Sequence, residues 1–394
     1  MGTKVILPLT NAPTELIATV LHHHLSLGQA FSLWKHPHSD EINLIISEEA
    51  PVYLDDFNMD ESIPGFVISP FEPLQKKVFL KASHRYLFTS TEVLKNGEPL
   101  TQDEVDAMNE PDQETVPFHY RTSSSPTQSF NEYTDLVRRS IKKIEEGLFE
   151  KVVPTRTKQI ELPESFDEVK LFLKLIKKYP HALVSLVSSN ETGTWIGATP
   201  ELLVSTDRNQ HFKTVALAGT QKYLPDTDVR TVAWTQKDIE EQALVCRYII
   251  SCFKKIRLRD YIEQGPKTVV AGNVLHLKTE FDVDMVATGF PQLGSIMLKL
   301  LHPTSAVCGM PLQNAMDFLL QEEGYDREFY SGYLGPVNID NETHIYVNLR
   351  CMQLLKDKKA KLYAGAGVTI GSIPEKEWEE TEIKMNTLLN VING

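Results

Sequence analysis

The chain has 394 residues, and its hydrophobic (41%) and charged (24%) fractions are typical of a globular protein. Its net charge of −13 argues against sequence-independent binding to nucleic acid or to an acidic membrane surface. The four scattered cysteines form no CxxC pair, no run approaches the roughly 18 apolar residues of a membrane span, and the N-terminus does not resemble a signal peptide, so we expect a cytoplasmic protein.

Residues 1–115 predict an N-terminal part of the fold. A helix is expected near Thr14–Leu27, and strands are expected within Ala30–Ser47 and at Gly65–Ile68, separated by polar and proline-rich turns. The catalytic region is expected to occupy 116–394. We expect it to form one continuous structural domain with the N-terminal part.

Two charged residues begin or adjoin apolar strands in the next part of the chain. Ser129 and Glu132 have the spacing of a capping box and predict a helix that begins after Ser129. Lys151 then opens a strand, where a lysine is often only a solvated charge. Glu201 follows a proline and precedes an apolar run, so burial would raise its pKa as a general acid requires. A turn carboxylate is the simpler interpretation of Glu201 by itself.

Further candidates follow at the ends of predicted elements. The strand Thr214–Thr220 ends in a small-residue turn whose backbone N–H groups could face an anion. Glu241 lies at the edge of the buried stripe of a long helix, where it either faces a cleft or caps the core. His302 lies in a loop, as a site residue or a helix cap. Arg350 lies in a predicted strand, Thr343–Leu355, and needs an anionic partner there.

The last stretch, from Tyr363 to Lys384, predicts a strand, a tight turn and a helix. Gly365 and Gly367 leave the strand backbone open to close approach by another group. Ser372 and Glu375 have capping-box spacing. Along the helix, one face carries two carboxylates and an ammonium at i, i+3 and i+7, which could hold a hard cation and an anionic ligand. A solvated charged face is the alternative. These three residues are Glu377, Glu380 and Lys384.

Eight segments between residues 130 and 392 together resemble the chorismate-utilising enzymes, and most closely the isochorismate synthases. Any one of them is a weak signal, but the set in this order is highly specific. The segments are KVVPTR from Lys151, TPELLVS from Thr199, ALAGT from Ala216, KDIEEQALV from Lys237, LHPTSAVCGMP from Leu301, DREFYSGYLG from Asp326, VNLRC from Val347 and YAGAGVTIGSIPEKEWEETEIK from Tyr363.

The resemblance implies an isomerase that adds water at C2 of chorismate while the C4 hydroxyl leaves and the double bonds shift. By this resemblance Lys151 is the base that activates the water, and Glu201 is the acid that protonates the leaving group. A lysine base needs a pKa below its usual value, and a glutamic acid needs one above it. Opposed shifts of this kind allow both steps to run in one pocket.

The resemblance also implies Mg²⁺ as cofactor. Glu241 and Glu380 would bind it, and Glu377 would act through a bound water or from behind the ligands. Arg350 would pair with the enolpyruvyl carboxylate. The other implied substrate contacts are Ala218, Gly219 and Thr220 around the ring carboxylate, His302 near the reacting edge of the ring, Gly365 and Gly367 along the open strand, and Lys384.

The residue at position 151 narrows the choice within the family. The ammonia-using anthranilate and aminodeoxychorismate synthases typically have glutamine there, so Lys151 indicates water as the nucleophile. Aminodeoxychorismate synthases also typically carry a lysine where this chain has Ala218. Salicylate synthases share the lysine base and then eliminate pyruvate, so they stay open as an alternative. A catalytically inactive chorismate-binding protein would lack some of these residues, and all are present.

The fold implied by the resemblance is α+β, with two mainly antiparallel sheets packed together and surrounded by helices. Chorismate would be the small-molecule partner of a monomer, and no glutamine amidotransferase subunit is expected. The product would enter the synthesis of menaquinone or of a catechol siderophore.

Overall fold

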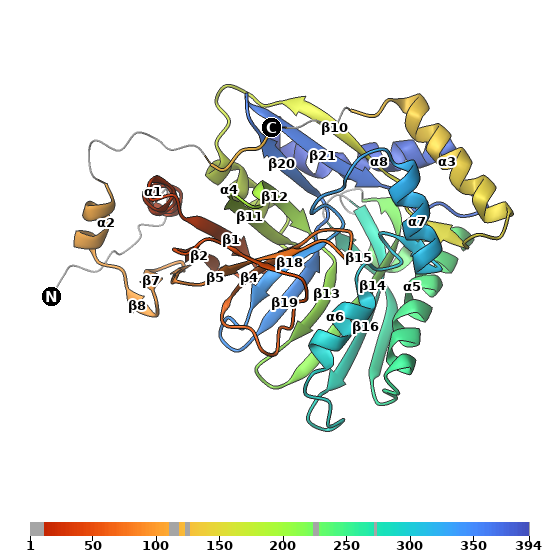
Figure 1. The fold of residues 1–394 in the computed structure, drawn as a ribbon, viewed down its shortest axis with the longest axis horizontal. Coiled ribbons are helices and arrows are strands. Elements are labelled where there is room, and N and C mark those ends of the chain that lie inside the picture. The colour runs from red at the N-terminus through yellow and green to blue at the C-terminus, as the bar shows by residue number, and fades with distance from the viewer. Residues whose placement is uncertain (1–11, 110–117, 123–126, 224–227, 272–273, 394) are drawn as a thin grey trace.

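The computed structural model describes residues 12–109, 118–122, 127–223, 228–271 and 274–393, and most of the strands fall into two large antiparallel sheets (Figure 1). The ten-stranded sheet has the spatial order β10 (Thr155–Glu161), β21 (Lys359–Gly365), β20 (Cys351–Leu355), β12 (Gly193–Thr199), β11 (Leu183–Ser189), β1 (Ala30–Lys35), β2 (Ile42–Ser47), β6 (His84–Phe88), β7 (Val93–Lys95), β8 (Glu98–Pro99). The nine-stranded sheet has the order β15 (Ile262–Ala271), β16 (Val274–Asp284), β14 (His211–Lys222), β13 (Leu202–Thr206), β19 (Thr343–Val347), β18 (Tyr333–Val337), β4 (Gly65–Ser69), β5 (Lys77–Lys81), β3 (Val52–Leu54). A small third sheet pairs β9 (Lys151–Val152) with β17 (Gly309–Met310).

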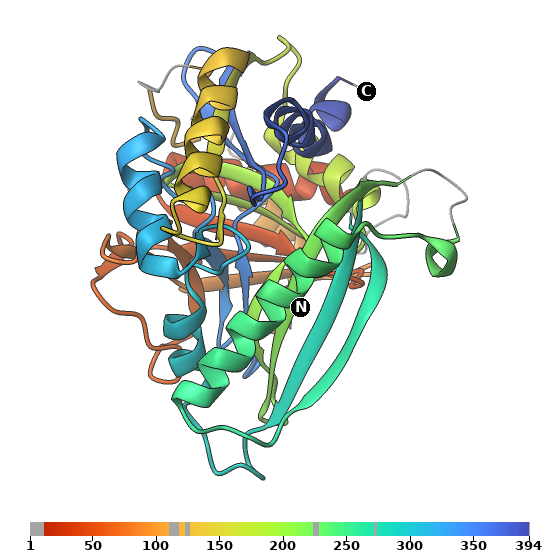
Figure 2. The same ribbon diagram turned by 90° about the vertical axis from the view of Figure 1, so that its right-hand side faces the viewer.

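The helices cover the outer faces of the two sheets. They are α1 (Ala12–Ser26), α2 (Gln102–Met108), α3 (Phe130–Glu145), α4 (Glu168–Lys178), α5 (Gln236–Lys255), α6 (Leu293–Leu301), α7 (Leu312–Glu322) and α8 (Pro374–Ile392). Apolar side chains of α1, α4 and α8 pack with the ten-stranded sheet. Those of α3, α5, α6 and α7 pack with the nine-stranded sheet, and Figure 2 shows α5 running across its strands.

A third apolar cluster joins the two sheets face to face. Trp34 and Trp195 of the ten-stranded sheet pack there with Phe66 and Tyr346 of the nine-stranded sheet. Because these strands alternate their side chains between two faces, each sheet buries one face against helices and the other against its partner sheet. This arrangement confirms the predicted α+β class.

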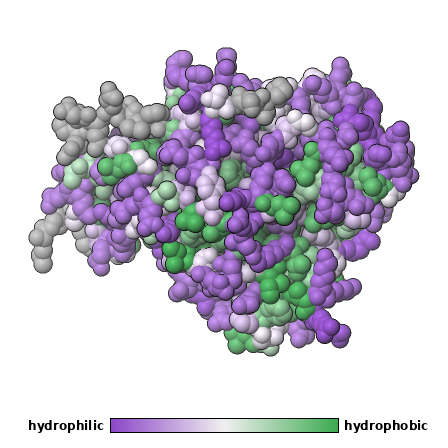
Figure 3. Space-filling view, viewed as in Figure 1, coloured by the Kyte–Doolittle hydropathy of each residue, from purple (hydrophilic) through white to green (hydrophobic). Residues whose placement is uncertain are grey.

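The surface of the molecule is mostly polar. Figure 3 shows hydrophilic residues over much of one face, with hydrophobic residues gathered near its centre. Within the described ranges, every helix is too short or too polar to cross a lipid bilayer.

Local predictions had different outcomes. The capping box of Ser129 and Glu132 is present at the start of α3. The one predicted at Ser372 is wrong, because α8 begins after Ile373 and the Ser372 hydroxyl accepts from the N–H of Thr369 instead. The predicted strand Thr343–Leu355 is also wrong as one element. It is divided between β19 and β20, which belong to different sheets, and Arg350 lies in the link that crosses between them.

Both sheets contain strands from before and after residue 115. In the ten-stranded sheet β1 pairs with β11, and in the nine-stranded sheet β4 pairs with β18. The predicted helix near residue 14 is α1, and the predicted strand region Ala30–Ser47 is the β1–β2 pair. These early elements therefore complete the sheets that carry the later ones.

A buried ion pair ties the two connections that follow β9 and α6 to the end of α7. Arg327 Nε donates to Glu323 Oε2 (2.7 Å), and its two Nη atoms donate to the carbonyls of Val307 (2.9 Å) and Val153 (2.8 Å). Glu323 also accepts from the backbone N–H of Thr155 (2.8 Å). Each partner thus satisfies backbone groups in addition to the opposite charge.

Substitution Glu323→Ala should lower the free energy of unfolding by about 3–5 kcal/mol, because it leaves the Arg327 guanidinium buried without its carboxylate. The adjacent Glu322 forms an exposed ion pair with Arg139, so Glu322→Ala should cost less than about 1 kcal/mol. Urea denaturation of the two variants and the parent protein would measure both. Equal losses at the two positions would contradict this account.

Candidate active site

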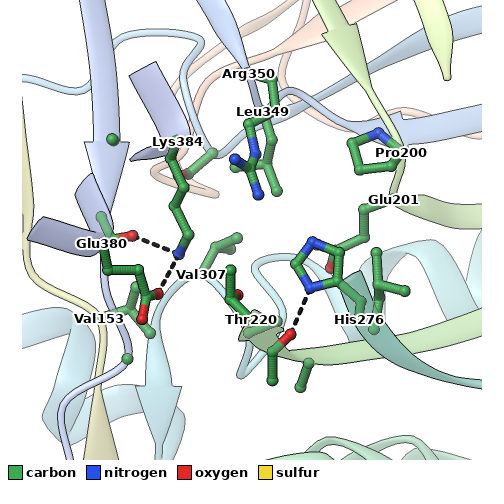
Figure 4. A pocket seen from close by; sticks show the side chains of 18 of the residues that line it. Val153, Pro200, Glu201, Thr220, His276, Val307, Leu349, Arg350, Glu380 and Lys384 are labelled. Atoms are coloured by element: carbon green, nitrogen blue, oxygen red, sulfur yellow. Dashed lines mark hydrogen bonds and ion pairs between the residues drawn. The ribbon is translucent and has the colours of Figure 1, made fainter. Parts of the chain in front are cut away.

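One cavity lies where the two sheets, α5 and α8 converge. Its volume is about 710 Å³ when the space open to solvent is included. Figure 4 shows Glu201 and His276 on one side of it and Glu380 and Lys384 on the other, with Arg350 between them. The predicted residues that line it are Glu201, Ala218, Gly219, Thr220, Glu241, Arg350, Gly365, Gly367, Glu380 and Lys384.

Two lysine–glutamate pairs lie on the side of the cavity that α5 and α8 form. Lys151 Nζ donates to Glu241 Oε1 at 2.7 Å, and Lys384 Nζ lies 2.7 Å from Glu380 Oε1. Lys384 also donates to the carbonyl of Gly365 at 2.7 Å. Burial alone would raise the pKa of Glu241, but the charges of Lys151 and other nearby lysines outweigh burial and hold this pKa below its usual value.

Lys151 does not itself line the cavity but lies directly behind Glu241. Its side chain is fully buried, at 0% exposure. A Cβ added at Gly367 would come within 2.7 Å of Glu241 Oε1 and 3.1 Å of Lys151 Cε. Only glycine therefore leaves room for the ion pair at this point of the wall.

Glu201 differs from Glu241 because no ammonium of the described residues is bonded to its carboxyl group. It precedes β13, and its carbonyl accepts from the N–H of Val347 (2.9 Å), which fixes its backbone to β19. The residue is 6% exposed, and burial raises the pKa of its carboxyl group from 4.5 to about 7 against the opposing charges of Lys151 and Lys384. A carboxyl group with this pKa is suited to general acid chemistry near neutral pH.

Arg350 presents a cation with unused hydrogen-bonding capacity. Its Nη1 is buried and has no partner among the described residues. Its backbone lies in the left-handed region, at φ 49°, and its carbonyl accepts from the N–H of Ala198 (3.1 Å). A buried guanidinium needs an acceptor, so this geometry favours an anionic ligand in the cavity.

His276, on β16, is a cavity residue that the sequence reasoning missed. Its Nδ1 lies 2.5 Å from the carbonyl oxygen of Gly219, so Nδ1 must carry the hydrogen. Burial lowers the pKa of this imidazole to about 3, which keeps the ring neutral. Nε2, buried without a partner within the described residues, is then free to accept from a ligand hydroxyl. The available signal was a histidine between two leucines, Leu275 and Leu277, in a buried strand.

Besides Lys151, two further predicted residues, His302 and Glu377, do not line the cavity. His302 Nε2 lies 3.0 Å from the carbonyl oxygen of Pro70, and its ring packs on Tyr333 outside the lining. Glu377, at 2% exposure, is held by Lys237 Nζ at 2.8 Å outside the lining. Among the described residues, no group of three or more His, Cys, Asp or Glu side chains is arranged to hold a metal ion.

Comparison with known proteins places these residues in a family. The family model described as chorismate binding enzyme matches residues 75–393. The chain belongs to the chorismate-binding enzyme family. All residues that line the cavity, from Val153 to Lys384, lie within the matched region.

Curated relatives and solved structures agree with this assignment. Isochorismate synthase EntC of Escherichia coli is 30% identical over 61% of this chain and 62% of its own length, so the chain spans less than two thirds of that relative. Isochorismate synthase DhbC of Bacillus subtilis is 29% identical over 68% of this chain and 69% of its own length. The structure of E. coli MenF, a menaquinone-specific isochorismate synthase, has a TM-score of 0.73 at 20% identity, with 99% of this chain and 95% of MenF covered. Anthranilate synthase component I of Streptococcus pneumoniae has a TM-score of 0.62 at 17% identity, with 98% and 94% covered. The two structures support the fold.

The raised pKa of Glu201 should appear in the pH dependence of stability. The folded carboxyl titrates near pH 7 and the unfolded one near 4.5, so the folded protein binds more protons between these values. The contribution of Glu201 is thus complete below pH 4.5 and is lost as pH rises through about 7. Relative to Glu201→Gln, the parent protein should lose up to about 3 kcal/mol of unfolding free energy across this window. Urea denaturation at a series of pH values measures the difference, and parallel curves would contradict the assignment.

Proposed function

We propose that the chain is an isochorismate synthase, which converts chorismate to isochorismate by adding water at C2 and releasing the C4 hydroxyl. The observation that carries the proposal is one cavity that holds an acid with a pKa raised to about 7, Glu201, and a wall behind which a buried lysine, Lys151, is paired with Glu241. The isochorismate synthases EntC and DhbC, which share 29–30% identity with this chain, support it.

In the proposed reaction, one residue removes a proton from the attacking water and another donates a proton to the leaving oxygen. In the ion pair with Glu241, Lys151 is an ammonium and must first lose a proton. As the amine, it would then take a proton from water as oxygen bonds to C2. Glu201 gives its proton to the departing C4 oxygen, which leaves as water. His276 Nε2 accepts from a substrate hydroxyl on the Glu201 side, which orients the leaving group. The pKa of Glu201, about 7, allows it to be protonated at the start of each cycle near neutral pH.

Anionic groups of the substrate would be bound at two places. Arg350 has an unpaired Nη1 for the enolpyruvyl carboxylate. The turn of Ala218, Gly219 and Thr220 faces the cavity at a bulge of β14 and would hold the ring carboxylate. Tyr330 and Tyr363, whose rings stack at 5.1 Å between centroids, also line this cavity.

The donor set also fits Mg²⁺. Glu241 and Glu380 are hard oxygen ligands on the same cavity, and the missing Cβ of Gly367 leaves space at Glu241. Two protein carboxylates suffice for this ion because it retains several waters. When bound, Mg²⁺ would neutralise a substrate carboxylate beside the acidic wall. Glu377, which is paired with Lys237, would act on the ion through a bound water or from behind the two ligands.

We further propose that the protein acts as a monomer in the cytoplasm. Water as nucleophile removes the need for a subunit that supplies ammonia, so no glutamine amidotransferase partner is expected. The product would serve menaquinone or siderophore synthesis, the two settings that the names of the relatives indicate.

Product analysis tests the function directly. Purified protein incubated with chorismate and Mg²⁺ should form isochorismate, detected by chromatography and mass spectrometry. Activity should disappear in EDTA and fall by at least about a hundredfold in Lys151→Ala, because the base is lost. Salicylate with pyruvate would instead identify a salicylate synthase. Absence of conversion by folded, Mg²⁺-supplied protein would leave a chorismate-binding protein without catalysis.

Gly367→Ala should reduce kcat by about 10- to 100-fold, because its methyl group would displace the ends of Glu241 and Lys151. These are flexible side-chain ends, so the melting temperature should change little. Gly371→Ala is the matched control, because a Cβ at this nearby position meets nothing within 4 Å. Unchanged turnover in Gly367→Ala, or equal losses in both variants, would contradict the role of Gly367.

A further inference from the structure

Two cavity residues that are not glycine adopt left-handed backbone conformations. Ser331 has φ 61° and Arg350 has φ 49°, and both line the cavity. This conformation is unfavourable for residues with a side chain, and it persists where the surroundings impose it. Such residues gather at sites where a side chain must be held in one direction.

A small hydrogen-bond network fixes both residues from Asn348. Ser331 N donates to the carbonyl of Asn348 (2.9 Å), and Asn348 N donates back to the carbonyl of Gly332 (2.9 Å). The Asn348 side chain donates to the carbonyl of Phe329 (2.9 Å). A Cβ at Gly332 would lie 1.9 Å from the carbonyl oxygen of Ser69, so this segment is pressed against β4 and has no room to relax. Arg350 follows Asn348 by two residues and is fixed by the same link.

Both side chains offer hydrogen-bond donors that the described protein does not use. Ser331 is 1% exposed, and its buried Oγ has no partner in ordinary hydrogen-bond geometry within the described residues. Its hydroxyl still interacts with the phenol of the adjacent Tyr330 and opposes the rise that burial causes in the pKa of that phenol. Arg350 Nη1 is likewise buried without an acceptor. Because a buried donor without an acceptor is costly, two of them on one cavity indicate that a ligand supplies the acceptor.

We infer that Ser331 is a substrate-binding residue whose hydroxyl shares one carboxylate of the substrate with Arg350. This inference rests on the proposed function and adds a residue that the reaction scheme does not need. A neutral O–H beside a guanidinium gives a carboxylate a second hydrogen bond from a different direction, which fixes its rotation as well as its position. Ser331 would therefore act on substrate affinity and orientation rather than on proton transfer.

Two substitutions separate the hydroxyl from the backbone strain. Ser331→Ala removes the hydroxyl and keeps the strained conformation, whereas Ser331→Gly removes the hydroxyl and relieves the strain. Both should raise the dissociation constant of chorismate about tenfold or more, the effect of losing one hydrogen bond to a charged group. The KM should rise similarly and kcat should change less. Ser331→Gly should melt at or above the temperature of the parent protein.

Isothermal titration calorimetry with chorismate, with and without Mg²⁺, makes the measurement on the full chain. Ser140→Ala is the control, because its buried hydroxyl donates to the carbonyl of Leu136 within α3 and lies outside the cavity. If both Ser331 variants bound chorismate as tightly as the parent protein, the role of Ser331 would be overturned and the proposed function would stand. Weaker binding by Ser331→Ala but not by Ser331→Gly would also overturn it, since the hydroxyl would then be irrelevant. Failure of the parent protein to bind chorismate would overturn the proposed function as well.

Discussion

The ion pair between Lys151 and Glu241 is the interaction on which the arrangement of the cavity depends. An ammonium at 0% exposure must be balanced inside the protein, because an unpaired buried charge is far more costly than a paired one. Lys151 comes from β9 and Glu241 from α5, so the pair fixes a short edge strand against a helix that packs on the nine-stranded sheet. Gly367 lets the chain after β21 pass close to both side chains. Three separate elements thus meet at one pair of charges.

Two glutamates on the same cavity are driven to opposite protonation behaviour by their surroundings. Glu241 is bonded to an ammonium, and its pKa lies below the usual value. Glu201 is buried at the start of β13 without such a bond, and its pKa rises to about 7. Because the two side chains are chemically identical, the difference comes only from which element brings an ammonium within bonding distance. The architecture therefore sets the acid–base polarity of the cavity, a common way to divide roles between like residues.

Most of the candidate site could be predicted from the sequence because family motifs fix residue types at fixed positions, and Glu201 and Glu241 indeed meet at one cavity. The sequence patterns could not show where each side chain lies relative to the cavity. His302 shares a motif with cavity residues, but its ring turns to a different part of the core. Arg350 follows an alternating apolar pattern that continues across a change of sheet, so the crossing was invisible. His276 resembles an ordinary strand residue until pairing of β14 with β16 leaves one of its nitrogens without a partner.

The interleaving of early and late strands has a practical consequence for protein production. The family match begins at residue 75, after β1 and β4, yet β1 occupies the place beside β11 and β4 the place beside β18. All residues of β11 are buried. A shortened protein that began at the match would expose interior strands as bare hydrophobic edges, and such edges recruit other chains and aggregate. The family match begins at residue 75, but the strands that complete both sheets begin earlier in the chain. A shortened protein should therefore be designed from the strand pairing and not from the bounds of the match.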